Sequence, residues 1–180
     1  RPRPSKPLSA VWLLLIINIG VFLLQAVFYG YPPYFLKGPP LALRADQFLH
    51  GYVWQLITYQ FLHGGLLHVL LNCWGIFVFG RDVEEALGKR RFFWLYFTSG
   101  AAGGLLQVLA SLSMAGRFPL SVPVVGASAG LFGLIAAFAM MYPNRTLTLL
   151  LFFVIPVTLR ARTLLMIGGV VAILGLLTVG

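Results

Sequence analysis

The stretch HGGLLHVLLNCW, residues 63–74, places three polar side chains at the start of an apolar run. His68 and Asn72 are four residues apart, so in a helix they lie on one face, about one turn from each other. His63 lies off that face and precedes the predicted helix. Apolar residues continue to Gly80, which predicts a membrane-spanning helix. Because polar side chains inside a span are costly, these three residues mark a candidate functional site.

The composition of the chain is that of a protein embedded in a membrane. Of its 180 residues, 59% are hydrophobic and only 9% are charged, and the mean hydropathy is +0.91. Soluble domains carry roughly 25% charged residues, so water cannot surround this chain on all sides. The 13 Lys and Arg residues are scattered between apolar runs and form no stripe. Their pattern fits a lipid bilayer and excludes nucleic acid as the expected partner.

Five apolar stretches predict an all-α polytopic fold in one domain, residues 1–180. A helix crosses the hydrocarbon core in about 20 residues. The predicted spans are residues 8–29, 65–80, 92–114, 124–142 and 164–180. A sixth apolar piece, residues 147–158, contains Pro156 and is too short, so we expect it at the membrane interface. Residues 30–62, rich in proline and aromatic side chains, predict a long structured loop at the membrane surface.

The distribution of basic residues predicts a cytoplasmic amino terminus. With this orientation three basic residues lie outside, namely Lys37, Arg44 and Arg117. The other ten lie on the cytoplasmic side: Arg1, Arg3, Lys6, Arg81, Lys89, Arg90, Arg91, Arg145, Arg160 and Arg162. The loop of residues 30–62 is then external. The expected location is the plasma membrane of a bacterium.

A further polar residue interrupts the fourth predicted span, in GASAG at residues 126–130. The spacing G-x-S-x-G is used where a nucleophilic serine stands clear of its backbone, but small residues are also typical of closely packed membrane helices. In the predicted topology Ser128 lies a few residues below the outer surface, at a depth similar to that of His63, His68 and Asn72. Taken singly, Ser128 and Asn72 are compatible with helix packing, and the two histidines are compatible with interfacial residues; their convergence favours a catalytic site.

No metal or cofactor is expected at this site. The sequence contains no H-E-x-x-H motif, and Asp82, Glu84 and Glu85 fall on the opposite side of the membrane. The single cysteine, Cys73, offers no disulfide and is expected to serve in packing.

Three segments together resemble the rhomboid intramembrane serine proteases. They are WQLITYQFLHGGLLHVLLNCW at residues 54–74, DVEEALGKRRF at 82–92 and VVGASAGLFGLIAAF at 124–138. The resemblance implies a bundle of six spans, of which five are present here. It also implies a Ser–His dyad endopeptidase that cleaves transmembrane segments of membrane proteins.

The resemblance also implies roles for individual residues. Ser128 corresponds to the nucleophile, and His68 and Asn72 correspond to residues that help form the oxyanion hole. His63 supports the site from the preceding loop. Glu84 matches a structural carboxylate between the second and third spans.

Two features depart from the family's pattern. Trp54-Gln55 stands where the family often has Trp-Arg in the first loop. No histidine follows Ser128, whereas rhomboids carry the general base on a sixth span. We therefore expect that the chain is truncated before that span and is inactive alone. The alternative is a rhomboid-like protein that binds or escorts transmembrane clients without cleaving them.

The fourth predicted span also has a face of small residues, formed by Gly126, Gly130, Gly133 and Ala137. Such a face lets helices approach closely. The resemblance predicts that the sixth span packs there and brings its histidine to Ser128.

Overall fold

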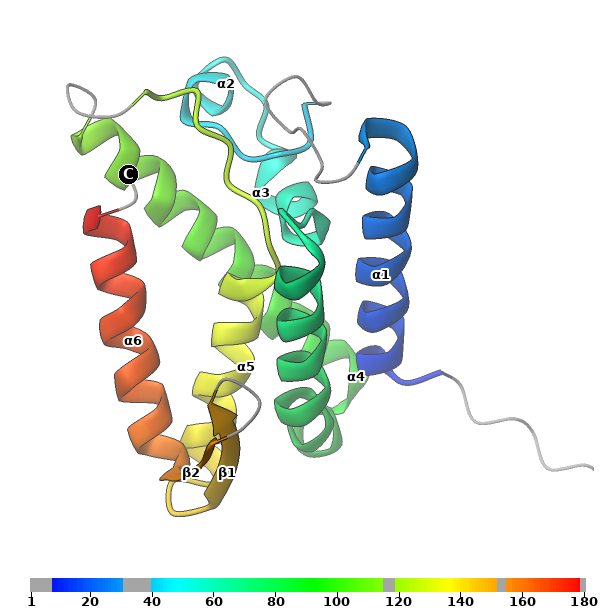
Figure 1. Ribbon diagram of the computed structural model, residues 1–180, viewed down its shortest axis with the longest axis vertical. Coiled ribbons are helices and arrows are strands. Elements are labelled where there is room, and N and C mark those ends of the chain that lie inside the picture. The colour runs from blue at the N-terminus through cyan, green and yellow to red at the C-terminus, as the bar shows by residue number, and fades with distance from the viewer. Residues whose placement is uncertain (1–7, 31–39, 115–118, 152–154, 179–180) are drawn as a thin grey trace, which may run out of the picture.

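The computed structural model describes residues 8–30, 40–114, 119–151 and 155–178. Its long helices form a bundle (Figure 1): α1 (Ala10–Tyr29), α4 (Leu66–Ser113), α5 (Ser128–Met141) and α6 (Ala161–Thr178). Shorter elements connect α1 to α4: α2 (Ala45–Leu49), α3 (Gln55–Thr58) and the 3-10 helix η2 (Tyr59–Phe61). Several residues of the sequence predictions lie outside the described ranges: Arg1, Arg3, Lys6, Arg117 and residues 31–39 of the first loop, including Lys37.

Helix α4 contains the predicted second and third spans, separated by a sharp turn at Gly88. Gly88 has φ 75° and ψ 159°, which is not helical. This conformation is essentially restricted to glycine, because a Cβ atom would strain it. The first half of α4, residues 66–87, and the second half, residues 89–113, are therefore two helices that reverse direction at Gly88.

The helices are apolar in the way a membrane bundle requires. Ala10–Tyr29 and Leu66–Ser113 are long and apolar enough to cross a membrane, whereas the apolar stretches Ser128–Met141 and Ala161–Leu174 are shorter. Large apolar side chains such as Val27 and Met140 are exposed. The helical bundle agrees with the predicted fold class, while the number of spans and the membrane position of residues 30–62 stay predictions.

Residues 146–151 and 155–160 depart from the all-α prediction and pair as two antiparallel strands. Strands β1 (Thr146–Leu151) and β2 (Ile155–Arg160) pair from Thr146–Arg160 to Leu151–Ile155. The hydroxyl groups of Thr148 and Thr158 lie 3.1 Å apart across the pair. Threonine favours strands, and a two-stranded ribbon tolerates Pro156 because both of its strands are edges.

The small-residue face of α5 is covered by the second half of α4. A Cβ atom on Gly130 would lie 2.7 Å from the ring of Tyr96, and one on Gly133 would collide with Ser99. Both glycines are buried. The expectation that a further span packs on this face is therefore wrong at Gly130 and Gly133, because another part of the same chain already contacts them.

Glu84 joins the turn of α4 to the start of α1. Its carboxylate accepts hydrogen bonds from the backbone N–H groups of Ala10, at 2.6 Å, and Val11, at 3.0 Å. Lys89 adds a bond from Nζ to the carbonyl oxygen of Leu8, at 3.0 Å. A carboxylate at a helix N-terminus is stabilised by the helix dipole. This geometry agrees with the structural role that the family resemblance implied for Glu84.

Candidate active site

Ser128 is the first residue of α5 and its side chain is exposed. The first N–H groups of a helix have no acceptor within the helix, and the helix dipole favours negative charge at this end. The hydroxyl of Ser128 and the backbone N–H groups of the first turn therefore share one open helix end. Such an end can bind a developing oxyanion beside a nucleophile.

Backbone hydrogen bonds hold the segment before α5 against the first loop. Leu43 and Val124 exchange bonds of 3.0 and 2.8 Å in an isolated antiparallel bridge. The N–H of Gly126 donates to the carbonyl oxygen of Tyr59 at 3.0 Å. The hydroxyl of Tyr59 in turn donates to the carbonyl oxygen of Gly100, in the second half of α4, at 2.7 Å. These contacts fix where Ser128 stands.

Gly126 brings His68 close to Ser128. A Cβ atom on Gly126 would lie 2.7 Å from Nε2 of His68 and 3.7 Å from Oγ of Ser128. Gly126 also has φ 129°, a conformation that L side chains rarely adopt. Only glycine therefore fits this position, since both the backbone and the approach of the imidazole exclude a side chain.

The hydrogen bonding of His68 determines where its ring carries a proton. The backbone N–H of Gly64 donates to Nδ1 of His68 at 3.4 Å. Nδ1 is therefore an acceptor, and the neutral ring holds its proton on Nε2. Since Nε2 is the atom next to Gly126, the ring directs an N–H donor toward the end of α5.

Asn72 offers a second donor one helical turn along from His68. Its side chain is only 5% exposed, and its amide nitrogen Nδ2 is buried without a partner among the described residues. An unpaired buried donor costs about 1–3 kcal/mol. This donor lies one turn from His68, so it is available to an oxyanion that forms beside Ser128.

His63 lies beneath His68 and is fully buried. The two rings meet edge to face, with centroids 5.0 Å apart. Nδ1 of His63 lies 3.2 Å from the carbonyl oxygen of Phe61. Burial, with a smaller contribution from His68, lowers the pKa of His63 to about 4, although the contact with Phe61 opposes this shift. His63 is therefore neutral at pH 7, and its ring contacts that of His68.

Gln25 holds the backbone of His63, and the sequence reasoning did not single it out. The N–H of His63 donates to Oε1 of Gln25 at 3.1 Å, and Nε2 of Gln25 reaches the carbonyl oxygen of His63 at 3.5 Å. Gln25 is 4% exposed. Gln25 and Asn18 are the two amides of the largely apolar helix α1, and this was the available signal, since a polar side chain in a span marks a partner.

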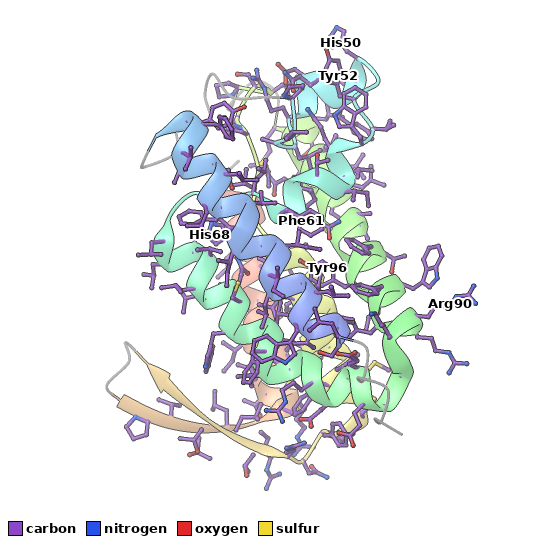
Figure 2. All side chains as sticks on the ribbon, turned by 90° about the vertical axis from the view of Figure 1, so that its right-hand side faces the viewer. His50, Tyr52, Phe61, His68, Arg90 and Tyr96 are labelled. Carbon is purple, nitrogen blue, oxygen red and sulfur yellow. The ribbon has the colours of Figure 1, made fainter. Side chains whose placement is uncertain are left out.

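The small residues of GASAG are explained by their neighbours. His68 lies against Gly126, the Cβ atom of Ala129 lies against Gly103, and the ring of Tyr96 lies against Gly130. Figure 2 shows Tyr96 directed into the bundle. The motif thus serves close helix packing and also leaves Ser128 exposed, so the two interpretations of its sequence are compatible.

Gln55 anchors the first loop although it departs from the family's Trp-Arg. Its side chain is fully buried, bonds Gln47 at 2.6 Å and the carbonyl oxygen of Pro40 at 3.3 Å, and accepts from the N–H of Arg44 at 3.1 Å. The remaining histidine, His50, lies at the far end of this loop from His68 (Figure 2). Of the chain's three histidines, His63 and His68 are thus the two in the site.

The family match and the similar proteins all carry the rhomboid name. Residues 50–179 match the family described as the Rhomboid domain. The putative rhomboid protease YdcA of Bacillus subtilis is 37% identical over 92 residues, which are 51% of this chain and 43% of that protein. Rhomboid protein 1, mitochondrial, of Saccharomyces cerevisiae is 30% identical over 152 residues, which are 82% of this chain and 41% of that protein.

A third relative is named as inactive. Inactive RHOMBOID-like protein 8 of Arabidopsis thaliana is 33% identical over 85 residues, which are 47% of this chain and 22% of that protein. The chain spans less than half the length of each of these three relatives.

Proposed function

Because this chain belongs to the rhomboid family of integral membrane proteins, we propose that it is an intramembrane serine endopeptidase with Ser128 as its nucleophile. The observation that carries the proposal is the exposed hydroxyl of Ser128 at the start of α5, with Nε2 of His68 against the neighbouring Gly126. The proposed substrates are membrane proteins, cleaved within or beside their transmembrane segments. No metal or cofactor takes part in the proposed reaction.

The proposed chemistry is acyl transfer through a tetrahedral intermediate. A histidine base takes the hydroxyl proton of Ser128 as Oγ attacks the scissile carbonyl carbon. The backbone N–H of Ser128, Nε2–H of His68 and the amide of Asn72 stabilise the oxyanion. The base then returns the proton to the leaving amine, and the peptide C–N bond breaks. Water, deprotonated by the same base, hydrolyses the acyl-enzyme and frees Ser128.

The base of this dyad is proposed to lie outside the 180 residues. His68 has its Nδ1 lone pair engaged by Gly64 and presents a proton, not a lone pair, toward Gly126. His63 is buried behind it. Neither ring is placed to take the proton of Ser128, so a histidine from a further span supplies this function.

The proposed location is a bacterial plasma membrane with the amino terminus in the cytoplasm. The described basic residues other than Arg44 support this orientation, since they belong to the end of the bundle that holds the Gly88 turn and the β1–β2 hairpin. Ser128 then lies toward the outer face, and substrates enter from the bilayer. The second candidate function is that of a rhomboid-like protein that binds clients without cleaving them. One relative is named as inactive, which supports testing this candidate.

The decisive experiment compares Ser128→Ala with Ser121→Ala in the natural full-length protein. Cleavage of a single-span substrate in liposomes is expected to stop in Ser128→Ala, because the variant lacks the proposed nucleophile. Ser121 is exposed and outside α5, so Ser121→Ala is expected to cleave at the wild-type rate.

Cleavage by Ser128→Ala at the wild-type rate would remove Ser128 from the nucleophile role. If the wild type binds the substrate, as measured by crosslinking, but never cleaves it, the client-binding candidate replaces the protease.

A further inference from the structure

The second half of α4 carries a hollow that the proposed proteolysis does not use. It has a volume of about 270 Å³ and is lined by Arg90, Phe93, Trp94 and Phe97. These residues are spaced i, i+3, i+4 and i+7, so they share one helix face over a rise of about 10 Å. The lining is apolar apart from Arg90, which stands at one end beside the Gly88 turn.

The apolar part of the hollow faces away from the protein core. Trp94 is 63% exposed, and Phe93 and Phe97 are half-buried and stack with centroids 6.0 Å apart. In a membrane protein an exposed aromatic face of this kind contacts lipid, and tryptophan favours the level of the headgroups. The surface therefore fits the upper part of an acyl chain.

The charged end of the hollow has no counter-ion in the described part of the chain. Arg90 makes no ion pair or hydrogen bond there, and it projects away from the bundle (Figure 2). Asp46 pairs with Arg44, Asp82 pairs with Arg145, and Glu84 accepts from the start of α1. The fourth acid, Glu85, lines a separate hollow.

Basic neighbours raise the positive potential around Arg90. Lys89 and Arg91 flank it in sequence, and both are exposed. An unpaired guanidinium binds a phosphate group well, and each basic residue near a membrane surface contributes about 1 kcal/mol of attraction to anionic lipid. A guanidinium beside an apolar groove is thus complementary to a phospholipid with an anionic headgroup.

We propose that this hollow is a binding site for an anionic phospholipid, whose phosphate pairs with Arg90 and whose acyl chain lies along Phe93, Trp94 and Phe97. The site takes no part in peptide-bond cleavage, so it does not depend on Ser128 being a nucleophile. It would secure the Gly88 turn at the membrane surface.

Quenching of Trp94 fluorescence by brominated lipids tests the site directly. The full-length protein is reconstituted with increasing fractions of dibromo-phosphatidylglycerol or dibromo-phosphatidylcholine. Each protein is also measured with Trp94→Phe, and the difference isolates Trp94 from the other three tryptophans. The anionic lipid is expected to reach half-quenching at about a fivefold lower mole fraction, which corresponds to the ~1 kcal/mol contributed by one basic residue.

Three variants make the assignment to Arg90 specific. Arg90→Gln is expected to lose most of the preference for the anionic lipid and to keep only the part due to Lys89 and Arg91, whereas Arg90→Lys is expected to retain most of it. Arg162→Gln, which removes an exposed basic residue elsewhere, is expected to behave like the wild type. Equal quenching in the wild type, or an unchanged preference in Arg90→Gln, would overturn the proposal. Absence of quenching by both lipids would also overturn it, because protein would then cover Trp94.

Discussion

His68 and Asn72 lie one turn apart in the first half of α4, and each carries an N–H donor suited to an oxyanion. The donor of His68 is set by the backbone N–H that occupies its Nδ1, and the donor of Asn72 is buried without a partner among the described residues. Preorganised donors stabilise the transition state more than the ground state, because the charge they face develops only during reaction. At the scale of single residues, these two donors are the strongest support for the proposed chemistry.

We predict that His68→Ala and Asn72→Ala each lower kcat by about 10²–10³. Gln107→Ala serves as a matched control, since Gln107 is a half-buried polar residue of the same helix α4. Cleavage kinetics in liposomes measure the effect, and thermal unfolding checks that each variant is folded. If both variants cleave at the rate of Gln107→Ala, then His68 and Asn72 do not stabilise the oxyanion and serve only in helix packing.

The lowered pKa of His63 predicts that the stability of the folded protein depends on pH. Its pKa is lowered to about 4 in the folded protein, compared with about 6.5 in an unfolded chain. Between these two values the unfolded state binds a proton that the folded state excludes, so stability falls as the pH decreases from about 6.5 to about 4. The contribution at pH 5 is about 2 kcal/mol.

Thermal unfolding in detergent at pH 7 and pH 5 measures this effect. His63→Gln is expected to lose less stability over this interval than the wild type, because glutamine does not titrate. His50→Gln, which changes an exposed histidine, is expected to keep the wild-type difference. An equal loss in the wild type and His63→Gln would show that the ring of His63 does not resist protonation.

Individual elements are held in place by contacts at their ends. Helix α1 begins where Glu84 accepts its first N–H groups, and α5 begins where Gly126 bonds Tyr59. The two halves of α4 meet at Gly88, whose positive φ sets the reversal of direction. The elements that carry Ser128 and His68 are therefore held by a contact beside the site, at Gly126, and by a turn far from it, at Gly88.

We predict that Gly88→Ala destabilises the protein by about 1–3 kcal/mol. No atom lies within 4 Å of the added Cβ, so backbone strain alone causes the loss. Gly20→Ala is the matched control, since Gly20 also has open space but lies inside helix α1. Denaturation in mixed detergent micelles compares the two variants with the wild type. An equal stability of Gly88→Ala and Gly20→Ala would contradict the argument from φ.

At the scale of the whole molecule, the candidate site lies at one end of the bundle, and the described basic residues other than Arg44 belong to elements at the other end. Ser128 is at the end of α5 that approaches α3, whereas the Gly88 turn and the β1–β2 hairpin are at the other end (Figure 1). This separation is what the predicted topology requires of a site near one membrane surface and a cluster of positive charge near the other.

We predict that a protein made of these 180 residues alone cleaves no substrate, because none of its three histidines is placed to deprotonate Ser128. The natural full-length protein is expected to cleave. A fluorophosphonate probe is expected to label Ser128 in the longer protein and not in the 180-residue chain. Full cleavage by the short chain would return the base to His63 or His68.

Local features of the sequence determined where the apolar helices and the site motifs lie. Hydropathy and spacing are properties of neighbouring residues, so they located the apolar helices and the motifs around His68 and Ser128 without reference to the rest of the fold. They also indicated a glycine-rich helix, because small residues mark close approach. They could not say which helix makes that approach.

The tertiary structure alone decided which distant segments meet. It placed Tyr96 and Ser99 on the glycines of α5 and Gln25 on the backbone of His63. The physical reason is that each of these contacts joins groups separated along the chain, and their formation depends on how all the helices fill space together. A pattern read along the chain records that a polar or small residue needs a partner, but only packing in three dimensions selects the partner.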